Sequence, residues 1–440
     1  MTDRYGLMPF QLEGAEWLAN RDNGRGILGD EPGVGKTAQA LRAADMIGAR
    51  RVWTWCPALG RINWRREHEK FSLFVPEFRS ESYDMALNPD VQKAFKEFDP
   101  DVVILDEAHY LKNREAKRTT TMFGTYCRNT GLLRNIPFVY RLSGTLWMND
   151  ITELWTHLRC DYPHLIDFGN GPLSFMEFMD RYCEFMPDPH KGFKVIGNKQ
   201  DRLPELKKII RTIMLRRKAK DVIHDMPELF FGDVEIEADV LPSALQELVD
   251  HPEYQSLERI VENALEDDAV PLYMDEDSIP LARLRRLVGV VKAPIVADII
   301  ADELANNAYD KIVLFAWHKE VLDILESKLR SFGVAVVRGG QTDKIRQAMI
   351  DGFQNEKGCR VILVQIAAGY HTITLHAAAH VGMVEQAWTP DINFQAAKRA
   401  HRKGQTRAVR VRSFGLANTI DAGLNRVLVR KTRNLMELET

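Results

Sequence analysis

The stretch "GRGILGDEPGVGKTAQALRAADMI", residues 24–47, decides the fold that the rest of the chain must share. It places a short apolar run before a glycine-rich turn, "DEPGVGKT", and a helical pattern after that turn. A strand, turn and helix in this order direct backbone N–H groups and a helix N-terminus towards an anion. We therefore expect the turn to bind the phosphates of a nucleotide, with a purely structural turn as the alternative.

The chemistry expected of this turn follows from its side chains. Lys36 is expected to reach the β- and γ-phosphates, and the Thr37 hydroxyl to bind Mg²⁺. The strict phosphate-loop pattern has glycine where Asp30 stands. The nucleotide-binding residues expected in the loop are Gly33, Val34, Gly35, Lys36 and Thr37.

Short apolar runs alternate with amphipathic stretches along most of the chain, which predicts a parallel α/β fold. The expected strands are residues 25–29, 52–56, 102–106 and 138–143 in a first series, and 312–316, 334–337, 361–365, 380–384 and 409–414 in a second. Between the two series, residues 151–225 look helical and aromatic-rich, and residues 241–280 are acidic and helix-prone.

Length supports more than one domain, because single hydrophobic cores stop growing well below 440 residues. The expected division is a first lobe, residues 1–230, with a helical protrusion at 151–220. An acidic helical linker or second protrusion follows at 231–290, and a second lobe at 291–440. The acidic stretch is most simply a solvated helical linker, with an autoinhibitory mimic of DNA charge as the alternative.

The composition is that of an ordinary globular protein, and it does not indicate a binding partner. The chain has 45% hydrophobic and 28% charged residues and a net charge of −3. That balance hides segregation, since residues 391–440 carry 11 Lys/Arg against 4 Asp/Glu, whereas residues 241–280 carry 11 Asp/Glu against one arginine. A local basic face is enough for nucleic acid, so the net charge excludes no such partner.

Targeting features also give expectations. No apolar stretch reaches the roughly 18 residues of a membrane span, and the first residues do not resemble a secretion signal. Five scattered cysteines predict neither a disulfide framework nor a zinc site. We expect a protein of the cytoplasm that is not secreted, from a prokaryotic or viral host, without a membrane partner and as a monomer.

Two further strand ends carry polar side chains that suit ATP hydrolysis. "DVVILDEAHYLKN" ends a buried strand with Asp106, expected to hold Mg²⁺ through water, and Glu107, expected to activate the attacking water. "YRLSGTLWMND" places Ser143 and Thr145 after the next strand. Since carboxyl ends of parallel strands are where α/β sheets place ligands, these residues are expected near the phosphate loop, with a polar turn as the plainer alternative for the second segment.

These segments resemble the SNF2-like family of superfamily 2 helicases and translocases. The residues that carry the resemblance are "MPFQLEGAEWL", "DEPGVGKT", "CPALGRINWRREHEKF", "LDEAHYLKN", "RLSGTLWMNDITELW", "MLRRKAKDVIHDMP" and "WTPDINFQAAKRAHRKGQTRAVRV". The family's phosphate loop reads "DExGxGKT", which accounts for Asp30. Two segments depart from the family pattern, namely Leu146 in place of proline and "AAGYHTITL" in place of "AGxxGxxL".

The resemblance implies two tandem RecA-like P-loop lobes with parallel sheets and helical insertions between them. It implies an ATPase that uses ATP and Mg²⁺, translocates on double-stranded DNA and remodels what is bound there. Gln11 would read adenine, and Arg399 and Arg402 would contribute catalytic charge from the second lobe. Coupling roles would belong to His109, Ser143, Thr145 and Gln395.

Several points stay open on the sequence alone. A strand-separating DNA or RNA helicase, or a nucleotide-gated scaffold with little turnover, would use the same motifs. Trp388 is a weak candidate for nucleic-acid contact, and the other nucleic-acid contacts are unknown. The remaining aromatic residues on or beside predicted strands are expected to pack in the core rather than to stack on bases, namely Trp53, Trp55, Trp64 and Phe74. The spacing of Arg399 and Arg402 predicts that both lie on one helix face.

Overall fold

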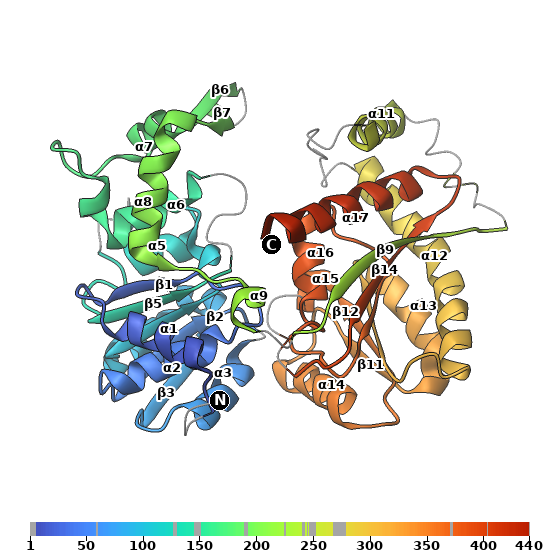
Figure 1. Ribbon diagram of the computed structural model, residues 1–440, viewed down its shortest axis with the longest axis horizontal. Coiled ribbons are helices and arrows are strands. Elements are labelled where there is room, and N and C mark those ends of the chain that lie inside the picture. Colours follow the sequence, from blue (N-terminus) through green and yellow to red (C-terminus); the bar gives the residue numbers. More distant parts are fainter. Residues whose placement is uncertain are drawn as a thin grey trace. The chain divides into compact units, whose positions relative to one another are not determined.

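The computed structural model describes residues 6–58, 60–125, 130–144, 151–188, 192–223, 226–239, 243, 245, 252–266, 279–369, 373–402 and 404–439. The chain divides into two compact units, Met1–Val222 and Ile223–Thr440, each built around one parallel sheet (Figure 1). Among the helices described, none is long and apolar enough to cross a membrane.

The first unit contains a six-stranded parallel sheet with the order β3-β2-β4-β5-β1-β8. Its strands are β1 (Arg25–Leu28), β2 (Arg51–Cys56), β3 (Glu77–Ser82), β4 (Val102–Asp106), β5 (Phe138–Leu142) and β8 (Met214–Leu215). Because β1, β5 and β4 are neighbours and run in the same direction, the residues that follow them gather at one edge of the sheet. This edge carries the expected nucleotide site.

Helices accompany this sheet in the first unit, because parallel strands need crossover connections that are usually helical. They are α1 (Pro9–Ala19), α2 (Lys36–Met46), α3 (Gly60–Phe71), α4 (Pro89–Phe98), α5 (Lys117–Phe123), α6 (Glu153–Asp161), α7 (Phe175–Tyr182), α8 (Leu203–Ile213) and α9 (Ala219–Val222). Two separate apolar clusters pack beneath them. Trp53, Trp55 and Trp64 lie in these clusters as expected, but Phe74 is 60% exposed, so its expected place in the core is wrong.

The protrusion of the first unit is not wholly helical. Strands β6 (Cys183–Asp188) and β7 (Gly192–Asn198) pair as an antiparallel hairpin between α7 and α8. Strand β8 then returns the chain to the main sheet beside β1. Sequence patterning missed both features because β8 has two residues and the hairpin strands have no strict alternation of apolar side chains.

The second unit contains a parallel sheet with the order β11-β12-β10-β13-β14-β9. Its strands are β9 (Leu229–Ile236), β10 (Ile312–Ala316), β11 (Val334–Val337), β12 (Val361–Gln365), β13 (His380–Met383) and β14 (Val409–Leu416). All five strands expected from the second series are present. Strand β9 lies outside the expected second lobe at 291–440, yet it pairs with β14 over its full length, so the sheet reaches back to residue 229.

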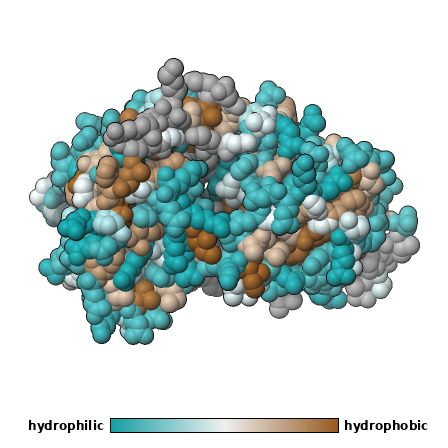
Figure 2. Space-filling model, turned by 90° about the horizontal axis from the view of Figure 1, so that it is seen from below, coloured by the Kyte–Doolittle hydropathy of each residue, from teal (hydrophilic) through white to brown (hydrophobic). Residues whose placement is uncertain are grey.

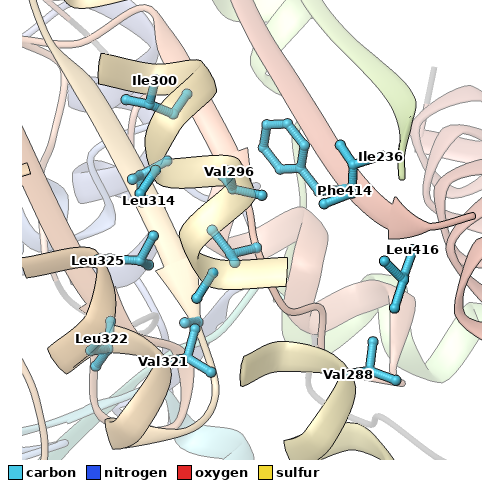
Figure 3. Close-up of a cluster of buried hydrophobic side chains, with 14 of the residues drawn as sticks. Ile236, Val288, Val296, Ile300, Leu314, Val321, Leu322, Leu325, Phe414 and Leu416 are labelled. Carbon is cyan, nitrogen blue, oxygen red and sulfur yellow. The ribbon is translucent and has the colours of Figure 1, made fainter. Parts of the chain in front are cut away.

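Seven α-helices accompany this sheet in the described part of the second unit. They are α11 (Pro252–Glu266), α12 (Ile279–Ala305), α13 (Lys319–Leu329), α14 (Asp343–Asn355), α15 (Ile366–Gly369), α16 (Pro390–Ala397) and α17 (Ile420–Glu439). Figure 3 shows Val296 and Ile300 of α12 close to Leu314 of β10 and to side chains of α13 in the apolar core.

The described part of the acidic stretch is a packed helix. In α11, Tyr254 and Val261 are buried, and the Tyr254 hydroxyl accepts a hydrogen bond of 3.1 Å from the Ile420 amide at the start of α17. The helical expectation therefore holds for residues 252–266, but this helix is packed on the second unit and is not a solvated linker. The face shown in Figure 2 is largely hydrophilic, with hydrophobic residues in separate patches.

Candidate nucleotide site

The phosphate loop has the strand–turn–helix form that the sequence predicts. Strand β1 ends at Leu28, and α2 begins at Lys36. Gly33 and Gly35 have φ of 92° and 85°, which L side chains rarely adopt, and Gly35 is the residue that precedes the first turn of α2. The backbone therefore bends so that the amides at the start of α2 face the turn, which is the arrangement that binds phosphate.

Lys36 and Thr37 occupy the first turn of α2. The Lys36 ammonium donates hydrogen bonds to the carbonyl oxygens of Asp30, at 2.5 Å, and Glu31, at 3.2 Å. It therefore lies across the loop that it is expected to share with phosphate. Val34 is fully buried beneath the loop, and Thr37 is partly exposed.

Asp30 holds the phosphate loop in place through contacts with Arg217 and Gln39. Its carboxylate is fully buried and pairs with the Arg217 guanidinium at 2.6 Å. It also accepts hydrogen bonds from the Arg217 amide, at 2.9 Å, and from the Gln39 side chain, at 3.1 Å. Glycine could make none of these contacts, which is a physical reason for an acid at this position.

The segment that follows β8 is bound to the same loop by its backbone. The Gly29 amide donates to the Leu215 carbonyl at 2.8 Å, and the Glu31 carboxylate accepts the Ala219 amide at 3.0 Å. Arg217 and Gln39 were not among the site residues expected from the sequence. Arg217 could have been found only by asking which cation compensates Asp30.

Gln11 bridges the N-terminal helix and the phosphate loop. Its side-chain amide donates to the Val34 carbonyl at 3.0 Å and accepts the Met8 amide at 3.0 Å. A Cβ on Gly35 would lie 2.3 Å from Gln11 Nε2, so a side chain larger than hydrogen would displace this contact. The structure thus places Gln11 against the loop, and adenine reading remains a prediction.

The acidic pair lies at the end of β4, as expected. Asp106 Oδ2 accepts a hydrogen bond of 2.8 Å from the Trp64 indole, and its backbone carbonyl accepts one of 2.8 Å from the Tyr83 hydroxyl. Burial and the neighbouring Glu107 carboxylate raise the pKa of Asp106 to about 6, although the Trp64 hydrogen bond and the Lys36 charge lower it. Sequence reasoning assigned Trp64 to the core alone and missed its contact with Asp106.

Glu107 has a left-handed backbone, with φ of 50°, directly after β4. Such a conformation is uncommon for a side chain of this kind and often occurs at functional sites. The nearby His109 Nδ1 lies 3.3 Å from Glu107 Oε2 and 3.2 Å from Ser143 Oγ. The structure thus brings three expected residues together, whereas Thr145 lies outside the described residues.

In the second unit, the basic run is not on a helix face as predicted. Helix α16 ends at Ala397, and Arg399 and Arg402 follow in a turn. Arg399 is 2% exposed, and its carbonyl accepts the Leu375 amide at 2.8 Å. Arg402 is partly buried and donates to the Thr374 hydroxyl at 3.1 Å. After Ala397 the helix tightens into a turn, in which the Arg399 and Ala400 amides donate to the Ala396 and Ala397 carbonyls at 3.1 Å each, and Gly404 has φ of 102°.

Two other side chains of this run hold the turn in place. Gln405, 6% exposed, donates to the His376 and Ala378 carbonyls at 3.0 and 2.7 Å. His401 Nε2 donates to the Pro227 carbonyl at 2.5 Å, and burial lowers the pKa of His401 to about 4, so its ring is neutral at pH 7. Gln405 and His401 therefore have a structural role in this motif, which its basic composition does not indicate.

Gln395 and Trp388 lie within the second unit. The Gln395 side chain donates to Asp391 at 2.7 Å along α16. Trp388 is 7% exposed, with the Arg285 guanidinium 5.1 Å from its ring centroid. Its ring therefore offers little surface for base stacking. The loop at residues 370–372, which departs from the family pattern, lies outside the described residues.

Comparisons with known proteins cover almost the whole chain. The family model of the helicase conserved C-terminal domain matches residues 295–404. The chain is 30% identical to the Caenorhabditis elegans homolog of SWI/SNF-related matrix-associated actin-dependent regulator of chromatin subfamily A-like protein 1, over 94% of this chain and 59% of that protein. It is 26% identical to the Mus musculus DNA annealing helicase and endonuclease ZRANB3, over 98% of this chain and 40% of that protein.

A solved structure, the Sulfolobus solfataricus SWI2/SNF2 ATPase core in complex with dsDNA, matches 98% of this chain and 94% of that chain at 21% identity and a TM-score of 0.42. The chain spans about half the length of the curated relatives described above. SNF2-type relatives match 94% and 98% of this chain, and together with the helicase C-terminal family model these matches support an SNF2-like superfamily 2 helicase or translocase.

Proposed function

We propose that this protein is a DNA-dependent ATPase that hydrolyses ATP to move along duplex DNA and to remodel what is bound there. One observation carries the proposal, namely that the phosphate loop, the Asp106–Glu107 pair and Ser143 follow neighbouring strands at one edge of the first sheet. The names of the relatives, which include an ATP-dependent helicase and a DNA annealing helicase, support the nucleic-acid part.

The residues at this edge suit ATP with Mg²⁺. A buried carboxylate whose pKa is raised to about 6 is stabilised as an anion by a nearby cation, so Asp106 fits a magnesium ion held through water, together with the Thr37 hydroxyl. Such an ion would offset negative charge on the phosphates. Lys36 and the amides of Gly33, Val34 and Gly35 would bind the phosphates, and Gln11 would contact adenine.

Glu107 is proposed to orient the attacking water and take its proton. His109 would hold the Glu107 carboxylate and connect it to Ser143, so a change at Ser143 would alter the base. Arg399 and Arg402 would approach the transferring phosphoryl group from the second unit, where their charge offsets the charge that develops. Since they belong to a separate unit, hydrolysis would need closure of the two units, with Thr145 and Gln395 in coupling roles.

The test is ATP hydrolysis measured without nucleic acid and with duplex DNA, single-stranded DNA or RNA. We expect stimulation by duplex DNA of at least about tenfold, and loss of turnover in Glu107→Gln with ATP binding retained. Glu97→Gln, an exposed acid on α4, is the matched control. Equal rates of ATP hydrolysis with and without DNA would contradict the proposal that the protein is a DNA-dependent motor.

The same assays separate the alternatives. Unwinding of a forked substrate, or stronger stimulation by RNA, would favour a strand-separating helicase. An undiminished biological effect of Glu107→Gln would favour a nucleotide-gated scaffold. A monomer in the cytoplasm of a prokaryotic or viral host stays a prediction, which sedimentation and localisation of the protein would check.

A further inference from the structure

A strongly basic segment leads into the phosphate-loop anchor, and the proposed ATPase chemistry uses only one of its charges. Residues 199–220 carry nine Lys/Arg against two Asp/Glu. Arg217 pairs with Asp30, and Arg202 with Asp201 and Glu205. The Lys199 ammonium donates to the Asp180 carbonyl at 2.5 Å. The question is what the cations of α8 do, since they lie between these two ends.

Helix α8 has one apolar face and one basic face. Leu206, Ile209 and Ile213 are buried, whereas Lys207, Lys208 and Arg211 are exposed. The three cations lie on one stripe, because positions three and four apart on a helix are neighbours. We call Lys207, Lys208 and Arg211 the α8 basic stripe. Figure 1 shows α8 running from the β6–β7 hairpin towards the sheet of the first unit.

Within the residues described, no carboxylate forms an ion pair with this stripe. Glu205, the only acid in α8, accepts two hydrogen bonds from the Arg181 guanidinium, at 2.8 and 2.7 Å, and one from the Tyr182 hydroxyl at 2.5 Å. Like charges one turn apart destabilise a helix by about 0.2–0.5 kcal/mol per pair. The stripe thus opposes the stability of α8 slightly, which is expected of a surface that binds an anion.

The stripe borders a shallow surface hollow of about 430 Å³, lined by Pro204, Lys207, Lys208, Arg211 and Thr212. At the C-terminal end of α8, the Arg21 guanidinium donates to the Thr212 carbonyl at 2.9 Å and adds a fourth positive charge. The cations are spread over more than one helical turn, which is about 6 Å along the axis. A linear polyanion matches this spacing better than a single small anion does.

We propose that the α8 basic stripe binds the phosphate backbone of the DNA on which the protein moves. This inference rests on the proposed function and adds a contact surface outside the nucleotide site and the motif loops. Lysine and arginine contacts of this kind carry little base specificity, and each lowers the salt sensitivity of binding when it is removed. The stripe would therefore add affinity without sequence preference.

The experiment compares the full chain with the variant Lys207→Gln/Lys208→Gln/Arg211→Gln, in which glutamine preserves helix propensity. A control of equal charge change, Lys93→Gln/Lys96→Gln/Lys357→Gln, removes exposed lysines elsewhere. Affinity for a labelled duplex is measured by anisotropy over a range of salt concentrations, together with ATP hydrolysis against DNA concentration.

We expect the stripe variant to bind duplex DNA at least about tenfold more weakly, with a salt slope reduced by about 2–3, while DNA-free hydrolysis stays at the wild-type rate. Equal affinity and slope in the stripe variant and the wild type would overturn the inference and point to an acidic protein partner instead. Equal losses in the control variant would overturn it too, because net charge alone would explain them. Wild-type protein that binds no DNA would refute the proposed function as well, which separates the two failures.

Discussion

The Arg217 guanidinium and the Asp30 carboxylate form a buried ion pair of 2.6 Å that binds the end of the first unit to its phosphate loop. Arg217 also donates to Asp30 through its backbone amide, at 2.9 Å, and to the Gln39 side chain at 2.7 Å. The pair lies five residues before the boundary between the two units, at Val222. The segment that leads to this boundary is therefore held directly against the loop that is expected to bind phosphate.

Breaking this pair should be costly, because it leaves a carboxylate at 0% exposure without its cation. Arg217→Met is expected to lower the free energy of unfolding of the first unit by about 3–5 kcal/mol. Arg217→Lys should recover only part of this, since lysine cannot reproduce the forked contact. Urea unfolding, with hydrogen exchange to assign the transition, measures the change.

A double-mutant cycle with Asp30→Asn provides the control for that prediction. If the pair acts as described, Asp30→Asn/Arg217→Met will be less destabilised than the sum of the single variants. Strict additivity would show that the two side chains act independently.

The Trp64 indole should determine, through the pKa of Asp106, the pH below which ATP hydrolysis is lost. The indole stabilises the ionised carboxylate, so Trp64→Phe removes a contact that lowers the pKa of Asp106. We expect the acid limb of kcat/KM to move from about pH 6 to higher pH by roughly half a unit or more. Trp55→Phe, at an equally buried indole, should leave the limb in place.

Asp106 should also oppose stability at neutral pH. Its pKa in the folded state is raised to about 6 from 3.8, so the folded chain binds the proton more tightly, and stability falls as pH rises from about 4 to about 6. Asp106→Asn is therefore expected to stabilise the protein at pH 7 by up to about 3 kcal/mol while abolishing hydrolysis. The gain should disappear near pH 4, and denaturant unfolding at both pH values tests this.

Arg402 is expected to act in turnover rather than in binding. Arg402→Ala should lower kcat by about 10³-fold or more, with a much smaller change in the affinity for ATP, because the charge it offsets develops in the transition state. Arg407→Ala, an exposed arginine of the same region, is the control. A variant with normal kcat and weakened DNA binding would assign Arg402 to the nucleic acid.

Ser143 is expected to connect the catalytic base to the DNA response. Ser143→Ala removes the hydroxyl 3.2 Å from His109 but leaves His109 beside Glu107. We expect DNA-stimulated hydrolysis to fall by roughly tenfold and DNA-free hydrolysis to change little. An equal loss in both would make Ser143 part of the hydrolytic site itself. Steady-state rates with and without duplex DNA measure the difference.

Sequence patterning located the strands that build the site but not all of those that support it. The strands at residues 102–106 and 312–316 agree with β4 and β10 residue for residue, because buried parallel strands are continuous apolar runs. Strand β8 was missed, because a strand of two residues is too short to show a periodic pattern of apolar side chains. Strand β9 was missed because only its pairing with β14 makes it part of the second sheet.

The turn that contains Arg399 and Arg402 likewise could not be predicted from local sequence. Helical spacing of Arg399 and Arg402 is a local property, but α16 ends at Ala397, and the turn that follows makes tertiary contacts such as the one from the Leu375 amide to the Arg399 carbonyl. Gln405 satisfies carbonyls from three places in the unit, and His401 binds Pro227, which is 174 residues away in the chain. No window of sequence contains these partners.

By itself, the sequence determined the strand–turn–helix of the phosphate loop, the carboxylates at the end of β4 and the parallel α/β class, since all of these depend on local apolar period, glycine and turn chemistry. Only the tertiary structure decided that Arg217 compensates Asp30, that Trp64 holds Asp106 and that α8 presents its cations without a carboxylate partner among the described residues. The physical reason is that charge compensation and burial depend on which distant side chains share a low-dielectric space, and that is settled when the sheets and helices pack.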